Sequence, residues 1–61
     1  MKRKDLIRHL ESNDCLFLRE GGGHSVYKNI QNGKMTTVPR HREIKESLVK
    51  KICDGLGIKR P

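Results

Sequence analysis

Two segments at opposite ends of this sequence place their apolar residues with the spacing of a helix. In each segment these residues recur one and four positions apart, so they line one stripe of a helix while charged residues occupy the rest. A helix with a single apolar stripe has to bury that stripe against another layer of structure. Asn13-Asp14 after the first segment and Gly57 after the second are typical of helix ends. The stripe residues are Leu6, Ile7 and Leu10 within residues 3–13, and Leu48, Val49, Ile52, Cys53 and Leu56 near the C-terminus.

Three segments between these helices have the composition of strands. Asn32-Gly33 separates the second from the third and is the strongest short hairpin signal in the chain. Pro39 ends the third segment, and because proline cannot donate a ladder hydrogen bond, we expect this strand at a sheet edge. The strand segments are residues 15–20, 24–31 and 34–39.

Together these segments predict a single α+β domain that spans residues 1–61. We expect two layers in the order α-β-β-β-α, with both helices on one face of a three-stranded antiparallel sheet and the other face left to water or to a partner. A chain of 61 residues recovers the entropy cost of folding, roughly 1.5 kcal/mol per residue, by a narrow margin. It has no room for a deep substrate cavity or a buried organic cofactor, so we predict that it uses no cofactor.

The charge of the chain indicates a polyanionic partner. Fourteen Lys and Arg residues stand against seven Asp and Glu residues, a net charge of +7, and so strong a field on a small surface is typical of nucleic-acid binding. Two aromatic residues, Phe17 and Tyr27, are too few for a platform that stacks single-stranded bases. The longest apolar run, residues 15–18, is far shorter than the ~20 residues of a membrane span, and no signal-peptide pattern is present. We therefore predict a cytoplasmic protein that binds no membrane.

The cysteines and histidines do not form a metal-binding pattern. Cys15 and Cys53 are far apart, neither belongs to a CxxC pair, and the three histidines occur singly. We predict no metal site. We also predict two reduced, mostly buried thiols, because small secreted folds with structural disulfides usually carry more cysteines.

The register of the hairpin determines where two of the histidines lie. If Asn32-Gly33 forms a two-residue turn, the pairing that follows places His24 directly opposite His41. Directly opposed side chains lie ~5 Å apart on one face of a sheet, so the two imidazoles could divide acid and base work near neutral pH. Lys28 would lie further along the same face, where it could hold a phosphate or stabilise developing negative charge. His24 and His41 are therefore the candidate catalytic residues.

This pair of groups suits the cleavage of RNA. The ribose 2′-OH is a built-in nucleophile, so a base that deprotonates it and an acid for the leaving oxygen are sufficient, without a metal ion or a covalent enzyme intermediate. Arg19, Lys28 and Arg40 are the candidate phosphate ligands, because they flank the proposed site in sequence or in register. Phosphate contacts position RNA without reading its sequence, so strong base preference is not predicted.

Two other functions fit the same composition. A non-catalytic module could recognise the shape of duplex RNA through phosphate and 2′-OH contacts, and a protein-interaction subunit could dock its exposed sheet face on a partner. In either case His24 is a solvated surface residue and His41 contacts phosphate or backbone at most. The glycines at residues 21–23 permit a tight turn or the close approach of a phosphate, and the sequence alone does not distinguish these two roles.

Several short stretches form a combination that is fairly specific in a basic chain of this size. It consists of a Gly-Gly-His before a hairpin, a Val-Pro-x-His stretch and a short terminal helix, and it comprises residues 4–10, 22–28, 32–33, 37–41 and 56–58. Through these residues, and over nearly its whole length, the chain resembles the HicA-type toxins of the YcfA family. These toxins are the mRNA-cleaving partners in HicA–HicB toxin–antitoxin pairs.

The resemblance implies a fold similar to the double-stranded-RNA-binding domain, an mRNA endoribonuclease activity that blocks translation, and a catalytic role for His24. Gly22 and Gly23 match the family motif, and we expect them to shape the turn that presents His24 to bound RNA. The resemblance also implies a HicB-type antitoxin that binds the toxin and covers His24. Because HicB usually carries a DNA-binding domain, contact with operator DNA is expected only through the antitoxin complex.

Overall fold

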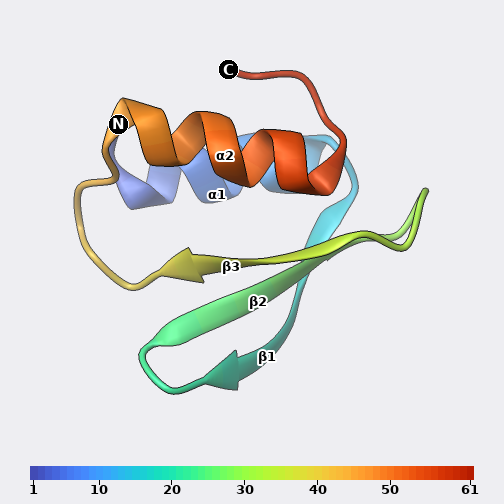
Figure 1. Cartoon of the computed structure of the whole chain (residues 1–61), viewed down its shortest axis with the longest axis horizontal. Helices are drawn as coiled ribbons and strands as arrows, with labels where there is room; N and C mark the ends of the chain where they lie inside the picture. The colour runs from blue at the N-terminus through green and yellow to red at the C-terminus, as the bar shows by residue number, and fades with distance from the viewer.

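The computed structural model describes residues 1–61 and contains two helices that cover a three-stranded sheet (Figure 1). The strands are antiparallel in the order β1-β2-β3, and both helices lie on the same side of the sheet (Figure 1). The predicted α-β-β-β-α fold is confirmed, as is the edge position of the third strand. Neither helix is long and apolar enough to cross a membrane. The elements are α1 (Arg3–Ser12), β1 (Cys15–Gly21), β2 (His24–Asn29), β3 (Met35–Pro39) and α2 (Glu46–Leu56).

The hydrophobic core lies between the sheet and the two helices. Both predicted stripes face it, with Ile7 and Leu48 partly buried at the margins, and Ile44 adds a buried side chain that the helical spacing did not identify. Cys15 and Cys53 are buried and unpaired, and burial raises the pKa of both thiols, which keeps them protonated at neutral pH. The ten core residues are Leu6, Leu10, Cys15, Tyr27, Val38, Ile44, Val49, Ile52, Cys53 and Leu56.

The turn between β2 and β3 is longer than predicted, and this changes the pairing of the two strands. The loop is closed by a hydrogen bond from the Asn29 N–H to the Lys34 carbonyl (2.8 Å), so four residues form it rather than two. His24 consequently pairs with Pro39, and the predicted pairing of His24 with His41 is wrong. The register differs from the prediction by two residues, so each side chain keeps the sheet face that was predicted for it.

Two asparagine side chains account for the longer loop, because they bind the last turn of α2. The Nδ2 atoms of Asn29 and Asn32 both donate to the Leu56 carbonyl, at 2.8 and 3.0 Å. Carbonyls at a helix C-terminus have no hydrogen-bond donor within the helix, and the two asparagine amides donate to the carbonyl of Leu56 instead. Gly57 then takes the left-handed conformation (φ 70°), and its N–H donates to the Asp54 carbonyl (3.1 Å). The predicted glycine cap is thereby confirmed.

A β-bulge in β1 sets the orientation of the second half of this strand. The pairing with β2 shifts after Phe17, so Leu18 is left over and Arg19 pairs with Val26. Because of this shift, Arg19 lies on the sheet face away from the helices and Glu20 lies on the face toward them. Without the extra residue the two charges would exchange faces. The sequence patterns did not predict the bulge.

Replacement of Gly57 by alanine is expected to lower the free energy of unfolding by at least about 1 kcal/mol. The new Cβ atom would occupy a left-handed residue and would lie 2.8 Å from Nδ2 of Asn32. Gly55→Ala is the matched control, because a Cβ atom there meets Thr36 at an ordinary contact distance of 3.5 Å and should stabilise α2 by up to about 1 kcal/mol. Urea unfolding measures both variants. Equal effects of the two substitutions would contradict the capping role of Gly57.

Candidate active site

The sheet face away from the helices, called the open face below, brings together three of the predicted site residues. The alternation along each strand puts His24, Arg19 and Lys28 on it, and the prediction that His24 and Lys28 share a face is confirmed. The open face consists of three rows that run across the strands, namely Gly21, His24 and Pro39, then Arg19, Val26 and Thr37, then Leu16, Lys28 and Met35.

His24 begins β2 directly after a turn of two glycines. Gly22 and Gly23 have φ angles of 36° and 84°, and positive φ at both positions is a feature of the type I′ turn, which favours glycine. His24 is exposed, and its one polar contact is the approach of Nδ1 to the Gly22 carbonyl oxygen at 3.4 Å. This distance is long for a hydrogen bond. The imidazole therefore stands at the end of the sheet with Nε2 free of any protein partner.

The ladder partners of His24 offer its imidazole no polar side-chain group. Gly21 has no side chain, and Pro39 has no polar side-chain group. Arg19 lies one row further along the open face and Lys28 one row beyond it, and neither forms an ion pair. Rows are separated by ~7 Å along a strand. The chain contains no group of three His, Cys, Asp or Glu side chains placed to hold a metal ion, so the site offers an imidazole and two cations.

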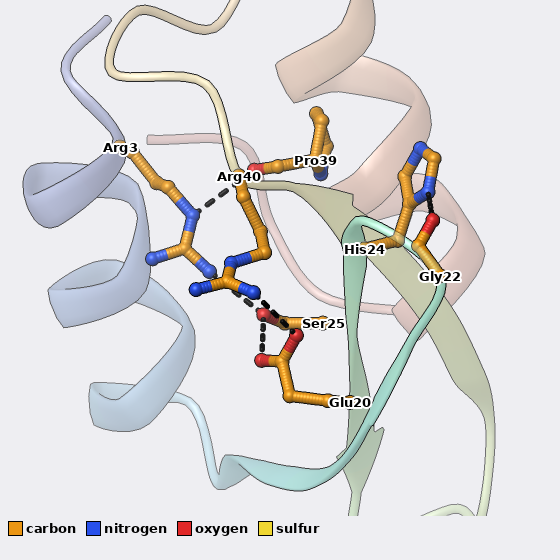
Figure 2. Close-up of polar contacts among 7 residues, drawn as sticks. All are labelled: Arg3, Glu20, Gly22, His24, Ser25, Pro39 and Arg40. Carbon is orange, nitrogen blue, oxygen red and sulfur yellow. Dashed lines mark hydrogen bonds and ion pairs between the residues drawn. The ribbon is translucent and has the colours of Figure 1, made fainter.

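Arg40 and His41 follow β3, which ends at Pro39. Arg40 turns toward the helix side, where its Nη1 atom lies 3.3 Å from Oε2 of Glu20. Figure 2 shows the imidazole of His24 pointing away from this guanidinium. His41 is exposed and lies past the last ladder pair of β3, so it does not oppose His24.

A buried serine lies next to His24 on the helix-facing side of β2. Ser25 is 2% exposed, and its Oγ atom accepts a hydrogen bond from Nη2 of Arg3 (2.9 Å) and donates one to Oε1 of Glu20 (2.7 Å). Hydrogen bonds to charged groups are about twice as strong as those between neutral groups. Ser25 therefore joins β2 to the start of α1 and to the bulged half of β1 (Figure 2).

The same two charged residues extend this network to the end of β3. Nε of Arg3 donates to the Pro39 carbonyl (3.0 Å), while the second carboxylate oxygen of Glu20 accepts from Arg40 (3.3 Å). The network thus contacts Pro39, one ladder partner of His24, and Glu20, the residue before the other partner, Gly21. Because α1, β1, β2 and the end of β3 all contribute to it, the imidazole projects from a rigidly defined corner of the sheet.

Arg3, Glu20 and Ser25 are residues of the site that the sequence patterns do not predict. One signal was available, because the alternation of β2 places Ser25 toward the core, where a hydroxyl needs partners. The partners themselves were not evident. Glu20 reaches Ser25 only because of the bulge, and Arg3 reaches it from the far end of the sequence.

Large apolar side chains accompany the cations of the open face. Leu16 and Met35 flank Lys28 and are 46% and 53% exposed, and Leu18 at the bulge is 45% exposed. Grouped apolar side chains on the surface of a small protein indicate an interaction site. The open face therefore combines positive charge with apolar contact area.

A family model matches nearly the whole chain. The model describes the HicA toxin of bacterial toxin–antitoxin systems, and it matches residues 3–58 of the 61. The match includes every helix and strand of the fold, together with the glycine turn and His24. The resemblance found from the sequence stretches is confirmed. No curated protein and no solved structure matches the chain.

Ser25→Ala is expected to lower the free energy of unfolding by about 1–3 kcal/mol, because it leaves Arg3 and Glu20 without their shared partner. Ser47→Ala is the matched control. Ser47 is exposed in the first turn of α2 and its hydroxyl forms no hydrogen bond, so its removal should change stability by less than about 0.5 kcal/mol. Urea unfolding of the two variants tests the network, and similar losses for both would show that Ser25 does not organise it.

Proposed function

Because the chain belongs to the HicA toxin family of bacterial toxin–antitoxin systems, we propose that it is an endoribonuclease that cuts mRNA and thereby blocks translation in the cytoplasm. His24 acts as the general acid or base. The observation that supports this most directly is the exposed imidazole of His24, which lacks a strong hydrogen-bond partner beside a cationic sheet face. A side chain that is open to solvent on a cationic face can reach the reacting atoms of a bound RNA strand.

The proposed reaction requires proton transfer and charge stabilisation only. A base removes the proton of the ribose 2′-OH, the 2′-oxygen bonds to phosphorus, and the bond from phosphorus to the 5′-oxygen breaks as that oxygen gains a proton. His24 performs one of the two proton transfers, and water can perform the other. Arg19 and Lys28, on the same face, stabilise the negative charge that develops on the phosphate oxygens.

The glycine turn contributes to the proposed RNA contact through its lack of side chains. Apart from the glycine itself and its two chain neighbours, no residue has a heavy atom within 4 Å of the position that a Cβ atom would take at Gly22 or Gly23. A phosphate can therefore approach the backbone of the turn closely beside His24.

We assign Arg40 and His41 to phosphate binding rather than to proton transfer. The pairing that would have put His41 opposite His24 is absent, and Arg40 is directed toward Glu20. Both residues remain exposed at the end of the sheet that carries His24, so they can contact RNA next to the scissile bond.

A toxin of this family acts together with an antitoxin, and we propose a HicB-type antitoxin that covers the open face. Leu16 and Met35 supply apolar area for such a contact, and burial of each contributes ~1.5–3 kcal/mol at most. A protein on this face would also cover His24, which explains how RNA cleavage is inhibited. Operator DNA is then contacted through the antitoxin rather than by this chain.

His24→Ala is expected to reduce RNA cleavage by at least ~10²-fold while the fold is kept, because an exposed side chain with one weak contact is removed. The measurement is cleavage of an mRNA by the purified protein, with the thermal unfolding midpoint as the check on folding. His9→Ala is the matched control, since His9 contacts the Lys59 carbonyl (2.8 Å) and should be dispensable for cleavage. Cleavage by the His24 variant at the parental rate would refute the assignment, and RNA binding without cleavage by the parent would select the duplex-RNA-binding alternative.

His41→Ala is expected to reduce cleavage by less than tenfold. A residue that contacts phosphate without transferring a proton contributes less than the ~10²-fold typical of general acid–base catalysis. The same cleavage assay measures the effect. A loss of ~10²-fold or more would return His41 to the proton-transfer step.

A further inference from the structure

The structure contains one pocket, and only cationic side chains line it. The pocket has a volume of about 410 Å³ and lies between the first residues of α1 and the segment that follows β3. No carboxylate and no apolar side chain lines it. Its residues, called the basic pocket below, are Lys2, Arg3, Lys4, Arg40 and Arg42.

Backbone hydrogen bonds bring these like charges together. The Arg3 N–H donates to the Arg42 carbonyl (2.9 Å), and the Ile44 N–H donates to the Met1 carbonyl (2.8 Å). The first residues of the chain and residues 42–44 therefore lie side by side. The positive charges lie close together because backbone hydrogen bonds hold the two segments that carry them side by side.

Most of the charge in the basic pocket has no carboxylate partner. Lys2, Lys4 and Arg42 are exposed and form no ion pair. Arg40 alone has one, with Glu20 at 3.3 Å. Like charges gathered in this way repel one another, and a bound anion relieves the repulsion.

The lining determines the chemical class of that anion. Without aromatic or apolar side chains the pocket offers no apolar surface to a base, whereas guanidinium and ammonium groups are the usual ligands of phosphate. Arg3 is held in place by its bonds to Ser25 and Pro39, and its remaining Nη1 atom has no partner. The positive end of the α1 dipole lies at the same place and acts in the same direction.

The basic pocket adjoins the corner of the sheet that carries His24. Arg3 donates to the carbonyl of Pro39, which is the ladder partner of His24, and Arg40 is the next residue along the chain. We propose that the basic pocket is a second phosphate-binding site, which holds backbone phosphates of the RNA strand that His24 cuts. This inference rests on the proposed function for the identity of the polyanion. The strand would pass over the end of β3, from the open face on one side to the basic pocket on the other.

The test is the affinity of the full chain for a single-stranded 2′-O-methyl RNA oligonucleotide, which lacks the nucleophile and cannot be cut. The double variant Lys4→Gln/Arg42→Gln removes two exposed charges of the pocket. The matched control, Lys50→Gln/Lys51→Gln, removes two exposed, unpaired charges of α2. At 50 mM salt we expect the pocket variant to bind at least about tenfold more weakly than the control variant. Its salt slope should also fall by about 0.7 for each phosphate that the variant no longer neutralises.

Equal losses of affinity in the two double variants would overturn the proposal, because the pocket would then contribute only its share of the net charge. Two further measurements identify other ligands. Inorganic phosphate could stabilise the parent against heat but not the pocket variant, while both bind the oligonucleotide equally. The pocket would then be a site for a free anion. Loss of the antitoxin complex with unchanged oligonucleotide binding would make it a protein-binding surface. Either result overturns the proposal.

The failure of this inference can be separated from the failure of the proposed function. If the parent cuts mRNA and the pocket variant binds and cuts as the control does, only the pocket proposal fails. If the parent binds the oligonucleotide through the pocket but cuts no RNA, the cleavage proposal fails and the pocket remains a phosphate-binding site for RNA.

Discussion

The buried hydroxyl of Ser25 is the point on which the arrangement of this small domain depends. Because water cannot reach it, its hydrogen bonds have to come from the protein, and the two partners, Arg3 and Glu20, belong to α1 and β1. Each partner is charged and makes a second contact, so the cluster also bonds to the end of β3, at the Pro39 carbonyl and the Arg40 side chain. With only ten buried apolar residues in the core, hydrophobic packing alone would define the corner around His24 less sharply.

The bulge in β1 decides which surface receives which charge. It turns Arg19 outward beside His24 and Glu20 inward, where the carboxylate satisfies Ser25 and Arg40. The open face is therefore free of carboxylates, although acidic and basic residues alternate closely in the sequence. In the proposed function this separation matters more than the net charge, because a carboxylate next to His24 would repel the phosphate that has to reach it.

Helix periodicity, strand composition and turn signals were sufficient to predict the fold, because the apolar stripes of the two helices have to be buried against the sheet. The same reasoning placed His24 and Lys28 on one face. It failed where a side chain from a distant segment decides the local geometry. Asn32 was expected to serve a two-residue turn, but it bonds to the end of α2, and the longer loop removes the His24–His41 pair. The bulge and the bonds of Arg3 are likewise tertiary effects that no local pattern contains.

β2 lies in the middle of the sheet, and this position limits how far its backbone can move. A central strand is hydrogen-bonded on both sides, so its backbone cannot shift without breaking two ladders at once, and exchange of its amide protons should require near-global opening. The imidazole at its first residue is thus attached to a strand that is paired on both sides. Arg19 on the edge strand β1 and Arg42 after β3 are exposed and form no ion pair that would fix their rotamers. In the proposed function, conformational adjustment on RNA binding therefore falls to the RNA and to those side chains, while the imidazole of His24 stays where the sheet holds it.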